Sequence, residues 1–231
     1  MTPRGTTAVV TGASRGIGRA IAMRLAGAGF DVALWARDIA ALHQVQAEIE
    51  RDGGRAQSFA CDVADPLAVV RAADAVRASM GPVRTVVNNA GSVLRKPTGA
   101  IGDAEWRAVM AVNLDGTFQV TRAFLDDLTR EGGRVINIAS RAGREGTPLL
   151  AAYCAAKHGV VGFTRALAEE LRAAKVCVNA VCPGSVDTAM LRAGLPDASP
   201  DMSPDDIART VLFLATEAPA ALTGACLDIY G

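Results

Sequence analysis

Tyr153 and Lys157 are four residues apart in the stretch YCAAK, and both residue types are rare in this chain. The sequence has two tyrosines, and only three of its 24 basic residues are lysines. On a helix, residues with this spacing lie on the same face. A free phenol titrates at about pH 10, and a neighbouring ammonium favours the phenolate and lowers that pKa. The pair therefore predicts a tyrosine that exchanges a proton with a substrate oxygen near neutral pH.

Ser140 ends the Val/Ile-rich stretch GRVINIAS, which comes shortly before Tyr153. A strand that ends here in a parallel sheet places the serine at the carboxyl edge, where open α/β sheets bind their ligands. We therefore group Ser140 with Tyr153 and Lys157 as candidate catalytic residues.

The stretch TGASRGIGRA follows the first expected strand and contains Gly12, Gly16 and Gly18. Glycine lets the backbone pass close to a pyrophosphate and lets a helix pack tightly on a strand. The helix that begins near Gly16 directs free N–H groups and the positive end of its dipole toward the phosphates. The spacing differs from the standard GxGxxG, and a tight turn without a ligand is the alternative. Its position between strand and helix favours a dinucleotide site.

Arg37 and Asp38 follow the second expected strand and bear on which dinucleotide binds. A carboxylate at the end of that strand would bind the ribose hydroxyls of NAD, whereas arginine pairs with the 2′-phosphate of NADP. Asp38 is about the right distance along the chain from Gly18, but it fits better as the N-cap of the following helix. Arg37 and Arg15 can converge on a phosphate dianion. The sequence thus favours NADP(H), with NAD(H) as the alternative.

These residues need a scaffold of alternating strands and helices. The expected strands are 6–12, 31–36, 56–62, 84–91, 133–140, 175–184 and 225–231. The expected helices are 16–28, 39–51, 66–79, 103–130, 152–173 and 204–216, with 188–203 irregular. Continuous apolar character within the strands indicates a parallel sheet buried on both faces. The alternation predicts a doubly wound α/β fold of about seven strands, in a single domain over 1–231.

Seven motifs connect these elements along the chain. They are TGASRGIG, CDVAD, NNAG, VNLDG, INIAS, YCAAK and VCPGSVDT. In this order and spacing they resemble the short-chain dehydrogenase/reductase family, and the resemblance covers essentially the whole chain. The pattern is most similar to β-ketoacyl-carrier-protein reductases and related small carbonyl reductases. The resemblance implies a Rossmann-like NAD(P)-binding fold.

The resemblance also implies roles for matching residues. Tyr153 resembles the general acid/base, and Ser140 the hydroxyl that binds the substrate carbonyl. Lys157 resembles the residue that lowers the tyrosine pKa and holds the nicotinamide ribose, and Asn113 the residue that anchors a water of the proton relay. The implied cofactor-binding residues are Gly12, Ser14, Arg15, Gly16, Ile17, Gly18, Arg37, Asp62, Val63, Asn89, Ala90, Gly91, Tyr153, Lys157, Pro183, Gly184, Val186 and Thr188.

Composition and charge exclude several other classes of protein. The net charge is zero and the arginines are scattered, so nothing indicates a nucleic-acid or anionic-membrane partner. No apolar run approaches the roughly 18 residues that a membrane span needs, and the N-terminus does not resemble a secretory signal. The five cysteines lack CxxC or His-paired spacing, so we expect reduced thiols in a cytoplasmic protein. Two isolated histidines, His43 and His158, indicate no metal site.

The sequence thus predicts an NADPH-dependent reductase of a small-molecule or acyl-thioester carbonyl. The alternatives are an NAD-dependent alcohol dehydrogenase of the same family and a protein that senses NADP without turnover. The resemblance implies a homodimer or homotetramer. Arg141 and Arg144 either meet an anionic substrate or lie on the surface, and we favour the surface. The segment after Thr188 is shorter than the family's usual lid, so we expect a more open or differently covered substrate site.

Overall fold

All seven expected strands form one parallel sheet in the computed structural model, which describes residues 5–231. The strands are β1 (Thr7–Thr11), β2 (Asp31–Ala36), β3 (Arg55–Ala60), β4 (Val83–Asn88), β5 (Arg134–Ile138), β6 (Cys177–Pro183) and β7 (Cys226–Ile229). Their order in the sheet is β3-β2-β1-β4-β5-β6-β7, and every neighbouring pair is parallel. This confirms the doubly wound, Rossmann-like fold.

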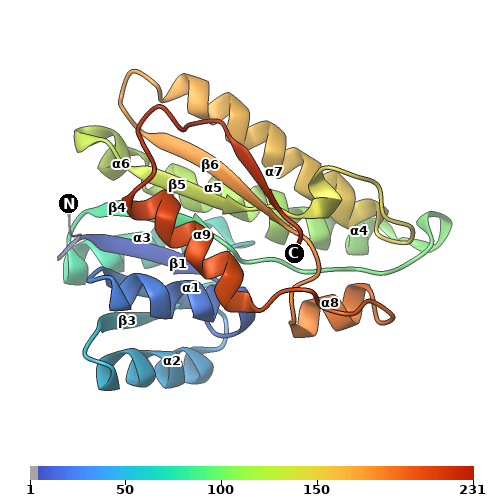
Figure 1. Ribbon diagram of the computed structural model, residues 1–231, viewed down its shortest axis with the longest axis horizontal. Helices are drawn as coiled ribbons and strands as arrows, with labels where there is room; N and C mark the ends of the chain where they lie inside the picture. The colour runs from blue at the N-terminus through green and yellow to red at the C-terminus, as the bar shows by residue number, and fades with distance from the viewer. Residues whose placement is uncertain (1–4) are drawn as a thin grey trace.

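Helices cover both faces of the sheet. They are α1 (Gly16–Gly27), α2 (Ile39–Arg51), α3 (Pro66–Met80), α4 (Asp103–Met110), α5 (Gly116–Ala123), α6 (Leu125–Glu131), α7 (Ala151–Glu170), α8 (Ala189–Gly194) and α9 (Pro204–Thr216). Helices α1, α2 and α9 pack on one face, and α1 and α9 lie side by side (Figure 1). Helices α3, α5 and α7 pack on the other. Within residues 5–231, none of these helices is long and apolar enough to cross a membrane.

The two cores account for the apolar runs within the strands. β1 and β6 are buried along their whole length. Successive side chains of a strand point to opposite faces, so Val10 joins the core under α1 and α9 while Val9 joins the core under α3 and α5. Because a parallel sheet is covered on both faces, every position of a central strand favours an apolar residue.

The prediction of one continuous helix over 103–130 is wrong. A π-helical turn, η2 (Ala111–Asp115), separates α4 from α5, and Phe124 leaves helical geometry between α5 and α6. The segment 188–203 also differs from the prediction, because it contains the short helix α8. The side chain of Thr188 caps this helix by accepting a hydrogen bond from the backbone N–H of Leu191, at 3.2 Å.

The order of the strands reverses between β1 and β4. β2 and β3 extend from one side of β1, while β4 to β7 extend from the other. The connections that follow β1 and β4 therefore diverge and leave a crevice beyond the carboxyl ends of these strands, where doubly wound folds bind ligands. The glycine turn after β1 and the NNAG segment after β4 meet at this switch point.

We predict that Gly18→Ala destabilises the fold because a Cβ at this position would overlap the carbonyl oxygen of Gly12 and the Asn89 side chain. The expected loss is about 1–3 kcal/mol in the free energy of unfolding, measured by urea denaturation. Gly27→Ala, on the same helix, is the matched control because no atom outside the helix lies within 4 Å of its added Cβ. This variant should be neutral or more stable by up to about 1 kcal/mol. Equal stabilities of the two variants would contradict the packing argument.

Candidate active site

The glycine turn is held in place from β4. Asn89 donates hydrogen bonds from Nδ2 to the carbonyl oxygens of Thr11, at 2.9 Å, and Gly12, at 3.3 Å. Thr11 Oγ1 in turn accepts from the backbone N–H groups of Asn89, at 2.9 Å, and Ala90, at 3.0 Å. Gly12 has a φ of +64°, and a Cβ there would lie 3.0 Å from Ala90 Cα. The turn therefore depends on glycine both for its conformation and for its close approach to NNAG.

The first turn of α1 provides an anion-binding environment. Arg15 is the N-cap residue with extended backbone, no side chain caps the helix, and the first turn contains no acidic residue. Free N–H groups and the positive end of the helix dipole are the features that bind a pyrophosphate. Ser14 and Ile17 belong to the same turn. The uncapped helix end without acidic residues fits the pyrophosphate of a dinucleotide.

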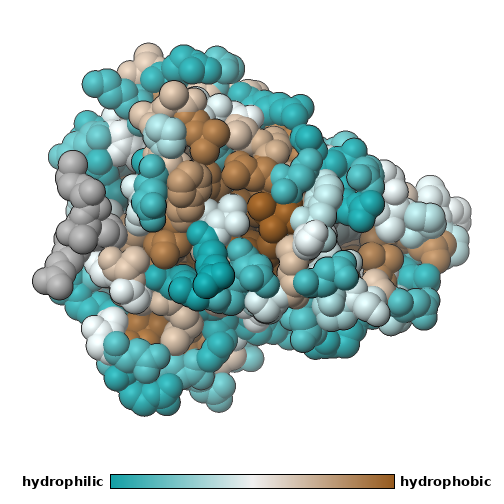
Figure 2. Space-filling view, in the orientation of Figure 1, coloured by the Kyte–Doolittle hydropathy of each residue, from teal (hydrophilic) through white to brown (hydrophobic). Residues whose placement is uncertain are grey.

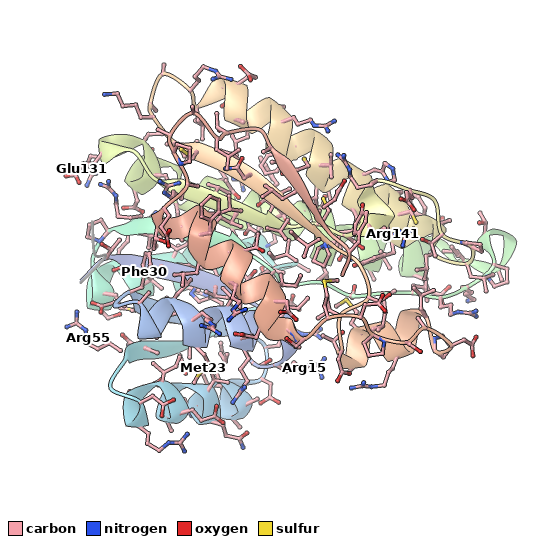
Figure 3. All side chains as sticks on the ribbon, viewed as in Figure 1. Arg15, Met23, Phe30, Arg55, Glu131 and Arg141 are labelled. Atoms are coloured by element: carbon pink, nitrogen blue, oxygen red, sulfur yellow. The ribbon has the colours of Figure 1, made fainter. Side chains whose placement is uncertain are left out.

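Arg15, Arg37 and Asp38 are exposed near this turn. Asp38 Oδ1 accepts a hydrogen bond from the backbone N–H of Ala41 at 3.0 Å, which confirms the prediction that it caps α2. Within residues 5–231, neither Arg15 nor Arg37 forms an ion pair. Both guanidinium groups are thus available to an anion. Figure 3 shows that Arg15 and Arg141 lie on the same side of the molecule, near the carboxyl ends of the strands.

Asp62 and Val63 follow β3 beside the helix pair α3 and α5. Asp62 Oδ1 accepts from the backbone N–H of Ala64 at 3.0 Å and so orders the CDVAD turn. Val63 is buried, and its side chain would lie 2.8 Å from a Cβ at Gly116. The turn is therefore fixed against the start of α5, and the adenine contacts implied for these two residues stay a prediction.

The segment after β6 reaches back to the glycine turn. The backbone N–H of Gly184 donates to Ile229 O at 2.8 Å, and Val186 is buried and bridges to Met202. The Thr188 methyl group would lie 3.4 Å from a Cβ at Gly16. Pro183, the last residue of β6, is buried. Thr188, which the resemblance implies at the nicotinamide end of the cofactor, thus lies next to Gly16, which it implies at the phosphates.

Ser140 follows β5, and Tyr153 lies in the first turn of α7, at the two ends of the connection between these elements. Ser140 is the N-cap of the 3-10 helix η3 (Arg141–Gly143), and its Oγ accepts from the backbone N–H of Ala142 at 3.1 Å. Burial raises the pKa of the half-buried Tyr153 to about 12, and a hydrogen bond with Ser140 opposes this rise. The phenol is therefore protonated at neutral pH and can donate its proton.

Lys157 lies behind Tyr153 and is only 4 % exposed. Its Nζ donates to the carbonyl oxygen of Ile138, the last residue of β5, at 2.8 Å and lies 5.7 Å from the centre of the Tyr153 ring. Burial lowers the pKa of Lys157 to about 8. In this geometry burial is the largest influence on the Tyr153 pKa and the Lys157 ammonium binds a backbone carbonyl, so the lowering of that pKa implied for Lys157 stays a prediction.

Asn113 lies fully buried in the π-helical turn. Its Nδ2 donates to Val109 O, at 2.8 Å, and to Ser92 O, at 2.9 Å, while its Oδ1 accepts from the Ser92 N–H at 3.4 Å. A Cβ at Gly91 would lie 2.9 Å from the same Oδ1. The side chain thus interrupts the helix and fixes the loop after NNAG. The water relay implied for Asn113 stays a prediction.

Asp228 and Tyr230, near the carboxyl end of the chain, lie close to the site but were not identified from the sequence. Arg144 pairs with Asp228, and Arg141 lies over the ring of Tyr230. Both arginines are exposed, which confirms the favoured surface position, and each also contacts a residue near the carboxyl end of the chain. The scarcity of tyrosine was the available signal, because Tyr230 is the second of two.

No group of three or more His, Cys, Asp or Glu side chains within the described range could hold a metal ion. The site brings together the phenol of Tyr153, the hydroxyl of Ser140 and the amine of Lys157, beside a turn that fits a dinucleotide. A phenol that keeps its proton next to a hydroxyl can bind an oxygen atom and protonate it.

Comparison with known proteins gives consistent matches over the chain. The family model described as short chain dehydrogenase matches residues 6–198. The 3-oxoacyl-(acyl-carrier-protein) reductase FabG of Pseudomonas aeruginosa is 35% identical, over 100% of this chain and 98% of that protein. The D-threitol dehydrogenase of Mycolicibacterium smegmatis is 36% identical, over 98% of this chain and 92% of that protein. A crystal structure of a variant actinorhodin polyketide ketoreductase with NADPH has a TM-score of 0.92 and 35% identity, covering 100% and 97% of the chains.

We predict that Lys157 titrates near pH 8, well below the 10.5 of an ordinary lysine, because burial disfavours its charged form. The chain has only three lysines, so NMR of protein labelled with ¹³C-lysine resolves each titration. Lys157→Met assigns the signal by removing it, and Lys96 and Lys175 serve as internal controls. Three lysines that all titrate above pH 10 would contradict the burial of the Lys157 amine.

Proposed function

This chain belongs to the short-chain dehydrogenase family of NAD(P)-dependent oxidoreductases, and from this we propose that it is an NADPH-dependent reductase of ketones or aldehydes. The proposed substrates are 3-oxoacyl compounds or other small carbonyls, and the product is the corresponding alcohol. The observation that carries the proposal is the half-buried phenol of Tyr153 on α7 together with the Ser140 hydroxyl at the carboxyl edge of the sheet, where burial raises the pKa of the phenol.

In the proposed reaction, the Ser140 hydroxyl and the Tyr153 phenol bind the carbonyl oxygen of the substrate. When bound at the glycine turn, a reduced nicotinamide dinucleotide would supply a hydride for the carbonyl carbon. Negative charge then develops on the oxygen, where two donors stabilise it. Tyr153 transfers its proton to this oxygen, so the substrate gains one hydride and one proton. The high phenol pKa keeps this proton available at neutral pH.

Lys157 has two proposed tasks beside the phenol. Its amine is held by Ile138 O, at the level of the Ser140 segment, and can present further hydrogen bonds to ribose hydroxyls. An amine with a pKa of about 8 can also take part in returning a proton to Tyr153. Asn113 would anchor a water of the same relay. Ser92, which binds both ends of the Asn113 amide, positions the loop beside it.

The proposed preference for NADP(H) rests on the charges near the glycine turn. The carboxylate of Asp38 is engaged in capping α2, whereas Arg15 and Arg37 are exposed with no ion pair in the described part of the chain. A 2′-phosphate would gain charge-assisted hydrogen bonds from these guanidinium groups. A ribose without phosphate would gain no such bonds, which makes NAD(H) the weaker ligand in this proposal.

A second candidate function is oxidation of an alcohol by an NAD-dependent member of the family. The identity of 36% with a D-threitol dehydrogenase favours it. Oxidation requires Tyr153 to accept a proton, and a phenol pKa of about 12 works against this at neutral pH. A protein that senses NADP without turnover is a weaker candidate, because Asn113, Ser140, Tyr153 and Lys157 are all present.

We also propose that the chain acts as one domain that assembles into a homodimer or homotetramer. Trp106 on α4 and Phe118 on α5 are 40% and 43% exposed, and Phe118 packs edge-on against Phe163 of α7. Figure 2 shows a second group of apolar side chains over the region of α9 and β7, where Phe213 is 40% exposed. Exposed apolar groups of this kind favour association between subunits.

The first test of the proposed reaction is Tyr153→Phe, which removes the transferable proton and keeps the ring. Folding and NADPH binding should survive, and single-turnover reduction should fall by about 10²–10⁴-fold, as for the loss of a general acid. Hydride transfer is followed by NADPH absorbance, and binding is followed separately by cofactor fluorescence. A variant that binds NADPH normally and reduces acetoacetyl-CoA at the parent rate would show that Tyr153 is not the proton donor.

The cofactor preference is tested by Arg37→Ala. Loss of a charge-assisted hydrogen bond of about 1.5–3 kcal/mol should raise the Kd for NADPH roughly ten- to hundredfold and leave the Kd for NADH nearly unchanged. The matched control is Arg51→Ala, at the far end of α2, where the arginine pairs with Asp52. Equal affinities of the parent protein for NADPH and NADH would refute the preference.

A further inference from the structure

The one-turn helix η3 directly follows Ser140 and has little stability of its own. Its backbone hydrogen bonds are those from Gly143 N to Ser140 O, at 2.9 Å, and to Arg141 O from Arg144 N, at 2.9 Å, and Glu145 N, at 3.0 Å. A single 3-10 turn of this kind is marginal in isolation, because few hydrogen bonds offset the cost of fixing its backbone. The conformation of Ser140 therefore depends on what holds η3 from outside.

On its inner side, η3 packs directly against α7. A Cβ at Gly143 would lie 2.7 Å from the carbonyl oxygen and 3.3 Å from the Cβ of Lys157. Before η3, the backbone N–H of Ala139 donates to Val181 O of β6 at 2.8 Å. The Ser140 segment is thus seated on the helix that carries Tyr153 and Lys157.

On its outer side, η3 is attached to β7 by Arg144. Arg144 Nε lies 3.3 Å from Asp228 Oδ1, and the two side chains are 30% and 37% exposed. Asp228 raises the pKa of Arg144, so the guanidinium stays charged. This ion pair joins Arg144, the residue after η3, to Asp228 in β7, which lies 84 positions further along the sequence (228 minus 144).

Arg141 makes a second attachment in the same place. Its guanidinium carbon lies 5.2 Å from the centre of the Tyr230 ring, within range for a cation–π contact. Its Nε donates to Glu145 Oε2 at 3.0 Å. Tyr230 itself packs against the residue that follows β6, because a Cβ at Gly184 would lie 3.2 Å from Tyr230 Cα. Both arginines thus bind elements outside the connection between β5 and α7.

We propose that Arg144 and Arg141 are positioning residues that hold η3 between α7 and the β7 region, and so hold the Ser140 hydroxyl beside the Tyr153 phenol. For catalysis this proposal rests on the proposed reductase function. The positions of Asp228 and Tyr230 then set the geometry of a serine that they do not touch.

The test uses Arg144→Gln and Asp228→Asn as single variants and Arg144→Asp with Asp228→Arg as a charge-reversed pair. The control is Arg172→Gln, which removes the exposed ion pair with Glu169 near the end of α7, where Nη2 and Oε1 are 2.5 Å apart. Amide hydrogen exchange of the 139–146 segment reports its order without any need for activity. Steady-state reduction of acetoacetyl-CoA with NADPH reports catalysis.

We expect both single variants to exchange faster in 139–146 and to lose about tenfold in kcat, because small displacements of a reacting group have large effects on rate. The KM for NADPH and the Tm should stay close to the parent values, because an exposed ion pair adds little to global stability. The charge-reversed pair should recover most of the lost kcat, and Arg172→Gln should match the parent in every measurement.

Parent-like exchange in 139–146, or a parent-like kcat in both single variants, would overturn the proposal. Failure of the charge-reversed pair to regain exchange protection would also count against the ion pair. A parent protein that reduces no carbonyl substrate with NADPH would refute the proposed function instead. In that case the exchange measurement still decides whether Arg144 orders the Ser140 segment.

Discussion

The buried hydrogen bond from Lys157 Nζ to Ile138 O joins the end of β5 to helix α7, and the arrangement of the site depends on it. Ser140 follows Ile138 by two residues, and Tyr153 precedes Lys157 by one helical turn. Fixing the amine on that carbonyl therefore helps to bring the hydroxyl and the phenol together. An amine buried in this way must have a hydrogen-bond partner, and the open end of a strand provides one.

Burial acts on the two titrating groups of this pair in opposite directions. It raises the pKa of the Tyr153 phenol to about 12 and lowers that of the Lys157 amine to about 8, because in each case it disfavours the charged form. The site thus holds an acid that keeps its proton at neutral pH and, behind it, a base that can exchange one. This combination suits the addition of a proton to a substrate oxygen better than its removal.

The sequence predicts the parts of this molecule that depend on local patterns. Apolar strands, the capping role of Asp38 and the need for glycine at position 18 follow from residue chemistry alone. The break at Asn113 could not be predicted, because it comes from a side chain that binds a loop distant in the sequence. The direction of the Tyr153 pKa and the partners of Arg144 likewise depend on burial and on β7, which no local spacing encodes.

The central position of β1 also has a consequence for folding kinetics. β1 pairs with β2 on one side and with β4 on the other, and Val9 is opposite Val86, 77 positions further along (86 minus 9). Local contacts can bring β1, β2 and β3 together early, but the β1–β4 pair must first close a long loop. The crevice between β1 and β4 therefore forms only after this long loop has closed. A chain that has formed only β1, β2 and β3 has the glycine turn but no dinucleotide site.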